Sequence, residues 1–368
     1  MAYKRIVIKL GTSTLTAGTP RLSTSHLVDL VRQMAVLRDS GCEVLVVSSG
    51  AIAVGRERMG YPQLPKEIPA KQMLAAVGQP RLMALYEQLF GLYGITVAQV
   101  LLIRSDFTDR RRYLNSRNTL NALLGQNIIP IINENDTVAT EEIRLGDNDN
   151  LSALVTNLIE ADLLILLTDQ PGLLTANPRH DPGAQLIREV SGAEIPEEFW
   201  KAAGGTKSGL GTGGMFTKVQ AADLARRSGA TVVIARGSEP DVMPRIVGGE
   251  RVGTLFHPVV SVLESRKRFI LAGGGAIGRL AVDEGAARAL RSGGSLLPIG
   301  LRGVEGRFDR GDAVRVDDQE GREIARGLVN YAVGDVVRLQ GHQSSEIEQI
   351  LGYHYGDEII HRNNMVIL

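Results

Sequence analysis

Four glycines fall within the six residues Gly209–Gly214, and a lysine, Lys218, follows them. Glycine lets the backbone approach a ligand closely and turn successive N–H groups toward one point. From Phe216 onward the apolar residues have helical spacing, and a helix N-terminus adds partial positive charge. With the ammonium of Lys218, the segment predicts a site for the phosphates of a nucleotide rather than a plain surface loop.

Two glycine motifs resemble the dinucleotide fingerprint G-x-G-x-x-G. Gly209–Gly214 matches it, but residues 200–207 before it have the pattern of a helix end and a polar loop, where the fingerprint needs a strand. Gly273–Gly278 follows a candidate strand at Arg268–Leu271, but an extended segment follows it and no acidic residue lies about 20 positions on. We interpret this second match as a linker. The chain contains no Walker A sequence.

Polar residues also follow several apolar stretches that we expect to be strands. They are Lys9–Ser13, Ser48–Ile52, Asn133–Asp136 and Thr168–Asp169. In open parallel sheets, ligands bind beyond the carboxyl ends of the strands. These residues therefore predict a ligand site along one edge of a sheet.

The segment Gly146–Asn150 is dense in acids and amides and precedes a helical pattern. Asp149 or Asn150 as a helix cap would explain only one of its four polar residues. The segment lacks the spaced ligands and final glutamate of an EF-hand. We expect it to bind substrate and to organise a magnesium-bound nucleotide.

Strand and helix patterns alternate up to about residue 237. Continuous apolar runs indicate strands buried on both faces, hence a mainly parallel sheet between helix layers. The expected strands are Arg5–Leu10, Val44–Val47, Val97–Leu102, Ile128–Ile132, Leu163–Leu167 and Thr231–Ala235, and the helices between them include 27–37, Leu82–Tyr93, Tyr113–Leu124, Leu151–Glu160 and Thr217–Ser228. Short β-like pieces separated by glycines follow, so we expect an α/β domain at 1–258, a linker at 259–276 and a small β-rich, barrel-like domain at 277–368.

The bulk composition is that of an ordinary globular enzyme. The 368 residues include 41 basic and 41 acidic ones, so no overall charge attracts nucleic acid or a membrane surface. The single cysteine, Cys42, excludes a disulfide framework and a multi-cysteine zinc site. No apolar run approaches the roughly 18 residues of a membrane span, so we expect a cytoplasmic enzyme.

Six segments occur in an order that resembles the bacterial glutamate 5-kinases of the amino acid kinase superfamily. They are IKLGTSTLT, SSGAIAVGRE, NENDTVATEEI, LGDNDNLSAL, LLTDQPGL and SGLGTGGMFTK. The tail from about Ile277 to Tyr355 resembles a PUA domain. The resemblance implies a three-layer amino acid kinase fold and the enzyme class EC 2.7.2.11. It also implies the first step of proline biosynthesis, in which the γ-phosphoryl group of ATP passes to the side-chain carboxylate of L-glutamate.

The resemblance also implies roles for individual residues. Ser49, Asp136 and Asn148 would bind glutamate. The residues implied in ATP binding are Lys9, Thr168, Asp169, Thr212, Gly213, Gly214, Met215, Phe216, Thr217 and Lys218. Lys9, Lys218 and Asp149 would be catalytic, with Asp149 holding both lysines. Mg²⁺ is expected with ATP, but no metal ligand is assigned.

The expected reaction needs no general base. A glutamate carboxylate has a pKa of about 4.3, so it is already an ionised nucleophile at neutral pH. Lys9, Lys218, Mg²⁺ and backbone N–H groups would offset the repulsion between the two anions. The Arg110–Arg112 cluster is a rival phosphate site, but we expect it to be a solvated helix face.

Further expectations concern partners and alternatives. By resemblance, proline is the feedback inhibitor, and the polar segment Thr137–Gly146 would be a mobile cover over the amino acid site. Glutamyl phosphate reductase and a homo-oligomer are the implied protein partners. An acetylglutamate or aspartate kinase stays open as an alternative. An RNA-binding protein is more remote, because residues 277–355 contain 10 Arg and no Lys against 12 acidic residues, a net charge of −2.

Overall fold

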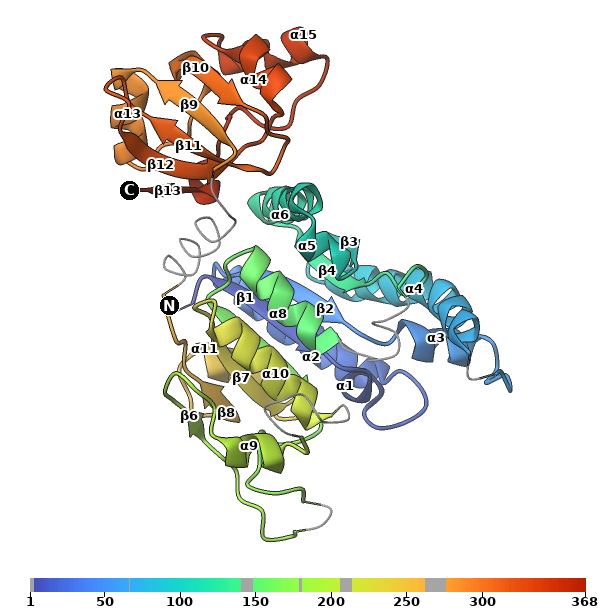
Figure 1. Cartoon of the computed structure of the whole chain (residues 1–368). Coiled ribbons are helices and arrows are strands. Elements are labelled where there is room, and N and C mark those ends of the chain that lie inside the picture. The colour runs from blue at the N-terminus through green and yellow to red at the C-terminus, as the bar shows by residue number, and fades with distance from the viewer. Residues whose placement is uncertain (1–2, 66, 140–147, 179–180, 206–213, 262–275) are drawn as a thin grey trace. The chain divides into compact units, whose positions relative to one another are not determined.

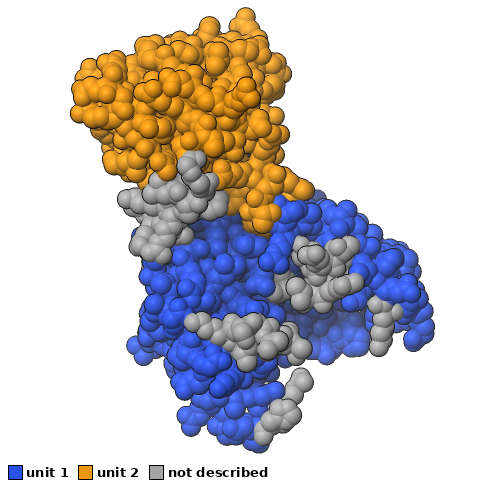
Figure 2. All heavy atoms as spheres, in the orientation of Figure 1, with its two compact units in different colours: residues 1–105, 117–262 blue, residues 106–116, 263–368 orange. Residues whose placement is uncertain are grey.

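The computed structural model describes residues 3–65, 67–139, 148–178, 181–205, 214–261 and 276–368. The chain forms two compact units, coloured separately in Figure 2. Unit 1 comprises residues 1–105 and 117–262, and unit 2 comprises residues 106–116 and 263–368. The division at 262/263 falls inside the expected linker. The inclusion of residues 106–116 in unit 2 was not anticipated.

Unit 1 is built on an eight-stranded sheet (Figure 1). Its strands, in spatial order, are β3 (Val97–Leu102), β4 (Ile129–Glu134), β2 (Glu43–Ser48), β1 (Arg5–Leu10), β5 (Leu163–Thr168), β7 (Thr231–Arg236), β8 (Thr254–Phe256) and β6 (Glu189–Val190). Every neighbouring pair is parallel except β7 and β8. The predicted, mainly parallel sheet is confirmed, and all six expected strands form.

Helices cover both faces of this sheet, which makes the three layers that were predicted. Figure 1 shows α8 (Asn148–Leu158) and α10 (Met215–Arg226) in front of the strands. On the other face, Ile6, Ile8 and Leu10 of β1 pack in one core cluster with residues of α2 (Thr24–Asp39) and α11 (Val242–Val247). Because side chains alternate along a strand, Lys9 points to the opposite face, toward α8.

Two glycines hold helices α3 (Ala51–Arg58) and α4 (Ile68–Gly91) in very close contact. A Cβ atom on Gly78 would lie 1.8 Å from the carbonyl oxygen of Ala51, and one on Gly55 would lie 1.9 Å from that of Leu74. Only glycine permits this approach of two backbones. The contact fixes α4 beside the Ser49–Gly50 turn from which α3 begins. Among the described part of the first 205 residues, further helices are α1 (Thr12–Thr16), α5 (Ser105–Thr108), α6 (Arg110–Gly125) and α9 (Glu197–Ala202).

Unit 2 contains a five-stranded, mostly antiparallel sheet, as expected for a small β-rich domain. The strand order is β10 (Leu301–Gly306), β9 (Gly278–Val282), β11 (Ala313–Asp317), β12 (Glu323–Leu328) and β13 (Met365–Ile367), with helices α13 (Glu284–Arg291), α14 (Val333–Leu339) and α15 (Ile347–Leu351). Leu114, from the segment 106–116, is fully buried in a cluster with Ala313 and Leu328. This segment is therefore part of the packing of unit 2.

Across the described ranges, none of the helices combines the length and apolar character that a membrane crossing requires.

Candidate active site

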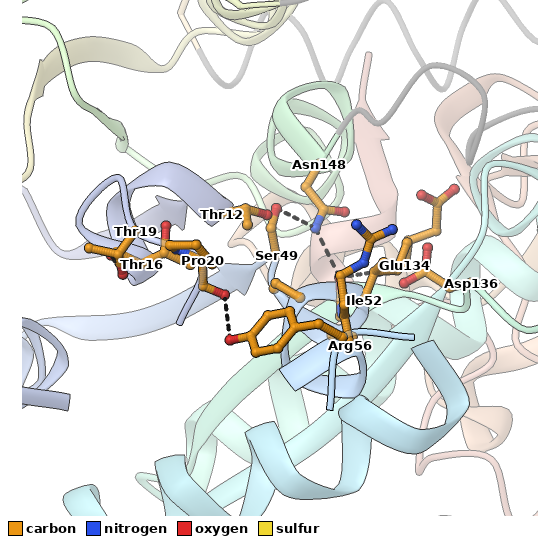
Figure 3. Close-up of a pocket in the computed structure, with 15 residues that line it drawn as sticks. Thr12, Thr16, Thr19, Pro20, Ser49, Ile52, Arg56, Glu134, Asp136 and Asn148 are labelled. Atoms are coloured by element: carbon orange, nitrogen blue, oxygen red, sulfur yellow. Dashed lines mark hydrogen bonds between the residues drawn. The ribbon is translucent and has the colours of Figure 1, made fainter. Parts of the chain in front are cut away.

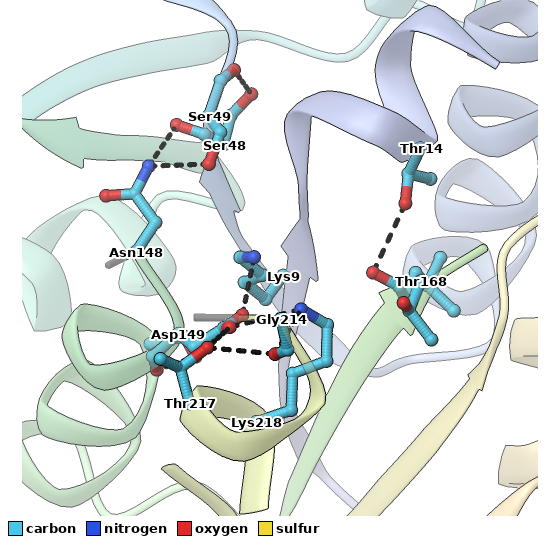
Figure 4. Close-up of polar contacts among 12 residues, drawn as sticks. Lys9, Thr14, Ser48, Ser49, Asn148, Asp149, Thr168, Gly214, Thr217 and Lys218 are labelled. Carbon is cyan, nitrogen blue, oxygen red and sulfur yellow. Dashed lines mark hydrogen bonds and ion pairs between the residues drawn. The ribbon is translucent and has the colours of Figure 1, made fainter. Parts of the chain in front are cut away.

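A buried carboxylate joins the two lysines that the sequence singled out (Figure 4). Lys9 comes from β1, Asp149 from the first turn of α8, and Lys218 from the first turn of α10. Asp149 Oδ1 lies 2.5 Å from Lys9 Nζ, and Asp149 Oδ2 lies 3.1 Å from Lys218 Nζ. The Thr217 hydroxyl donates to Asp149 Oδ2 at 2.7 Å. The three residues implied as catalytic are thus brought together. Asp149 lies inside the helix, so it is not the helix cap.

The electrostatics of this cluster keep Asp149 ionised. Burial alone would raise the pKa of Asp149, but the nearby charges of Lys9 and Lys218 and the hydrogen bonds of Lys9 and Thr217 lower it to about 2. Lys9 and Asp149 are 5% and 4% exposed. A permanent anion between two ammonium groups holds both lysine side chains close together.

The described part of the glycine-rich segment starts at Gly214, where φ is 68° at the N-terminus of α10. Thr212 and Gly213 lie outside the described residues. Met215 is half-buried, whereas the Phe216 side chain is buried edge-on against Trp200, with ring centroids 5.7 Å apart. Phe216 can therefore reach a nucleotide only through its backbone. Its packing anchors the first turn of α10, which carries Thr217 and Lys218.

Thr168 and Asp169 end β5, at the carboxyl edge of the sheet. The Thr168 hydroxyl donates to Asp169 Oδ1 at 3.0 Å. The Thr14 hydroxyl donates to the carbonyl oxygen of Leu167 at 3.2 Å and ties α1 to the same strand end. Thr168 and Asp169 therefore lie beyond the carboxyl end of a strand, where open parallel sheets bind their ligands.

Beside the lysine cluster lies a cavity of about 540 Å³ (Figure 3). It is open to solvent and contains all three residues implied in glutamate binding. Its lining residues are Thr12, Thr16, Thr19, Pro20, Ser49, Gly50, Ala51, Ile52, Ala53, Arg56, Tyr61, Asn133, Glu134, Asp136 and Asn148. Asn148 joins the cavity to the lysine cluster, because the next residue in the chain is Asp149.

The Asn148 amide is held by several oxygens. Its Nδ2 lies 2.9 Å from Ser49 Oγ, 3.1 Å from the carbonyl oxygen of Ser48 and 2.9 Å from Asn133 Oδ1. Its Oδ1 is buried and accepts no hydrogen bond from the described residues. A buried oxygen in this state is a candidate acceptor for a ligand's N–H or ammonium group.

Asp136 follows β4 and is half-buried in the cavity wall. Burial raises its pKa to about 6, so at pH 7 it is mainly an anion with little compensation. Such a carboxylate is suited to pair with a ligand ammonium group. Most of the proposed cover, Thr137–Gly146, lies outside the described residues.

Sequence reasoning missed several cavity residues. Asn133 was within a recognised strand end but received no role, and it now contacts Asn148. Arg56 of α3, also not singled out, brings a cation to the cavity wall. Its signal was its place in the segment SSGAIAVGRE, one helical turn beyond the Ser49–Ile52 turn.

The Arg110–Arg112 cluster, the alternative phosphate site, forms ion pairs with carboxylates. Arg111 Nη2 lies 2.7 Å from Asp309 Oδ2, and Arg112 Nε lies 2.6 Å from Asp106 Oδ1. Their side chains are 59% and 53% exposed, which fits the expected solvated face.

Within the described ranges, no group of three His, Cys, Asp or Glu residues could hold a metal ion.

Comparison with known proteins gives the family. The model of the amino acid kinase family matches residues 4–236, and that of the PUA domain matches residues 278–351. A glutamate 5-kinase of Shewanella oneidensis is 54% identical over 369 residues, which cover 100% of this chain and 99% of that protein. A glutamate 5-kinase of Shewanella amazonensis is 55% identical over 367 residues, which cover 100% of this chain and 96% of that protein.

A third relative, the glutamate 5-kinase of an Enterobacter species, is 54% identical over 363 residues, which cover 98% of each chain. The similarity thus extends through both units and includes the segments that contribute the lysine cluster and the cavity. The chain belongs to the glutamate 5-kinases, within the amino acid kinase family, and carries a C-terminal PUA domain.

Proposed function

We propose that this chain transfers the γ-phosphoryl group of ATP to the side-chain carboxylate of L-glutamate and releases L-glutamyl 5-phosphate. The observation that carries the proposal is the adjacency of Asn148 and Asp149 at the start of α8. Asn148 faces the cavity with Ser49 and Asp136, while Asp149 binds Lys9 and Lys218. An amino acid in the cavity therefore lies next to two ammonium groups.

The amino acid would be oriented by charge. Its ammonium group would pair with Asp136 and donate a hydrogen bond to Oδ1 of Asn148. Its side-chain carboxylate, ionised at neutral pH, would then point toward Lys9. This orientation disfavours acetylglutamate, whose acylated nitrogen carries no charge to pair with Asp136.

Transfer would proceed in line without a general base, since the nucleophile needs no deprotonation. Lys9 and Lys218 would stabilise the charge that spreads over the transferring group. Thr168, Asp169 and the Thr212–Lys218 segment would hold the nucleotide. Mg²⁺ fits as an ion carried mainly by the ATP phosphates, because the described residues form no protein cage for it, and it would neutralise phosphate charge.

The test is an ATP-dependent assay in which hydroxylamine traps the acyl phosphate as a hydroxamate. Glutamate, acetylglutamate, aspartate and UMP are compared, with hydroxamate and ADP both measured. We expect efficient turnover of glutamate alone, and a loss of kcat of about 10²–10³ in Lys218→Ala. Preference for another acceptor, or near-normal kcat in folded Lys218→Ala, would contradict the proposal.

Proline, which shares the α-amino and α-carboxyl arrangement of glutamate, would occupy an overlapping part of the same cavity. We expect it to inhibit competitively with glutamate. Inhibition that persists undiminished at saturating glutamate would place its binding elsewhere.

A further inference from the structure

A chain of four side-chain amides runs from the edge of the sheet to the cavity. Asn148 Nδ2 donates to Asn133 Oδ1 at 2.9 Å, and Asn133 Nδ2 donates to Gln79 Oε1 at 2.8 Å. Gln79 Nε2 then donates to Gln99 Oε1 at 3.2 Å. The chain links α8, β4, α4 and β3 in turn.

Two backbone groups fix the direction of this chain. The carbonyl oxygen of Ser48 can only accept, so the Asn148 atom beside it must be Nδ2. The backbone N–H of Glu134 can only donate, and it lies 2.9 Å from Asn133 Oδ1. Asn133 must therefore present its oxygen to Asn148 and its nitrogen to Gln79. Reversal of either amide would set two donors or two acceptors against each other.

Gln79, like Gln99, does not line the cavity. It is only 9% exposed and lies next to Gly78, whose contact with Ala51 fixes α4 against α3. Its oxygen accepts a hydrogen bond from Nδ2 of buried Asn133. Its nitrogen is directed to Gln99, which is exposed on edge strand β3.

We propose that Gln79 is a positioning residue for amino acid binding. Gln79 orients Asn133, and Asn133 in turn fixes the Asn148 amide with its Nδ2 directed at Asn133 Oδ1. The Oδ1 atom of Asn148 then remains to accept a hydrogen bond from the ammonium group of the amino acid. This inference rests on the proposed role of Asn148 in binding glutamate. Gln79 itself touches neither glutamate nor the lysine cluster.

The experiment compares three substitutions at one position. Gln79→Met removes both hydrogen bonds at similar volume, Gln79→Lys offers only a donor, and Gln79→Glu keeps an acceptor for Asn133. Exposed Gln99 can turn its amide to donate to the new carboxylate. We expect Gln79→Met and Gln79→Lys to raise KM for glutamate about tenfold, the equivalent of one lost hydrogen bond, with KM for ATP changed less than about twofold. Gln79→Glu should restore KM for glutamate to within about threefold of the parent protein.

Gln33 provides a matched control. It is fully buried on α2 and hydrogen-bonded at both ends, donating to Asp29 Oδ2 at 2.7 Å and accepting from the Met243 N–H at 3.0 Å. Gln33→Met should lower the urea midpoint of unfolding as Gln79→Met does, without raising KM for glutamate selectively.

Three outcomes would overturn the proposal. One is a Gln79→Met protein in which both KM values rise together, as general loss of structure would cause. Another is a Gln79→Glu protein as impaired as Gln79→Lys, a comparison that remains available if Gln79→Met does not fold. The third is an unchanged KM for glutamate in Gln79→Met. Asn148→Ala distinguishes failure of this proposal from failure of the proposed function. If Asn148→Ala raises KM for glutamate and Gln79→Met does not, only the positioning role of Gln79 is wrong. If neither variant raises KM for glutamate, the assignment of the glutamate site is wrong as well.

Discussion

Replacing Asp149 with asparagine removes the negative charge between two lysines and preserves the shape of the side chain. The pKa of Asp149 is lowered from 3.8 to about 2, and each pKa unit is worth about 1.4 kcal/mol, so its ionised form contributes about 2–3 kcal/mol to folding at pH 7. Loss of one partner from a buried ion pair typically costs about 3–5 kcal/mol, since the other charge is left uncompensated. We expect Asp149→Asn to lose about 3 kcal/mol of unfolding free energy.

The pH dependence of this loss has a definite sign. Because the pKa of Asp149 is lower in the folded chain than in the unfolded one, its stabilisation is fully present above about pH 4. It is lost as the pH falls toward about 2. The difference in unfolding free energy between parent and Asp149→Asn, measured with urea, should be constant from pH 7 to pH 5 and shrink below pH 4.

Catalysis should suffer separately from stability. Without the anion, Lys9 and Lys218 repel each other and leave their positions, and lost charge stabilisation of this kind lowers kcat by about 10²–10³. The hydroxamate assay measures this at temperatures where the variant is folded. Asp317 is the matched control, because it is also fully buried between two cations, with Arg279 Nε at 2.5 Å and Arg315 Nε at 2.8 Å.

We expect Asp317→Asn to lose stability and to keep its kcat. Turnover of glutamate by folded Asp149→Asn at near the parent rate would contradict this role of Asp149, because Lys9 and Lys218 would then be positioned without it. An equal loss of kcat in Asp317→Asn would also contradict it, since general destabilisation would explain both results.

Burial raises the pKa of Asp136 to about 6, so KM for glutamate should rise about tenfold from pH 7 to pH 5 as the carboxylate is protonated. Asp136→Asn should have a high KM for glutamate that does not depend on pH. Parallel pH profiles of KM in the two proteins would contradict this. Gly78→Ala places a Cβ 1.8 Å from the Ala51 carbonyl oxygen, so thermal unfolding should show a loss of at least about 1–3 kcal/mol; an unchanged Tm would mean that α3 and α4 separate freely. Truncation after Ser265 removes Ala313 and Leu328 and so uncovers Leu114. The free energy of unfolding of the remaining chain should fall by about 2 kcal/mol. A truncated protein that keeps the Tm of the full-length protein and shows no aggregation in light scattering would contradict this.

Much of the fold of unit 1 could be predicted because the central strands are apolar without interruption. The structure buries β5 completely, as its sequence Leu163–Leu167 indicates. Helix α4 was predicted only from Leu82, yet it begins at Ile68. Pro80 lies inside it and normally marks a helix boundary. Tertiary packing, above all the contact of Gly78 with α3, overrides that local signal.

The candidate site was predictable where one residue carries an obvious charge or ends a strand. The family resemblance implies a joint role for Lys9, Asp149 and Lys218, and Asp149 does join the two lysines in the structure. Gln79 could not be found in this way. It lies in the unpredicted half of α4, and its significance comes from partners on β4 and β3 that only the folded sheet brings beside it.

The grouping of residues 106–116 with the C-terminal segment has a consequence for synthesis of the chain. Leu114 leaves the ribosome about 200 residues before Ala313 and Leu328, which at about 5–20 residues per second is an interval of roughly 10–40 s. During that interval the Leu114 side chain is not yet covered by Ala313 and Leu328, and the neighbouring arginines lack their carboxylate partners from the C-terminal segment. Nascent chains should therefore depend on a holding chaperone over this window, and slow codons in the second half of the gene would lengthen their exposure to aggregation.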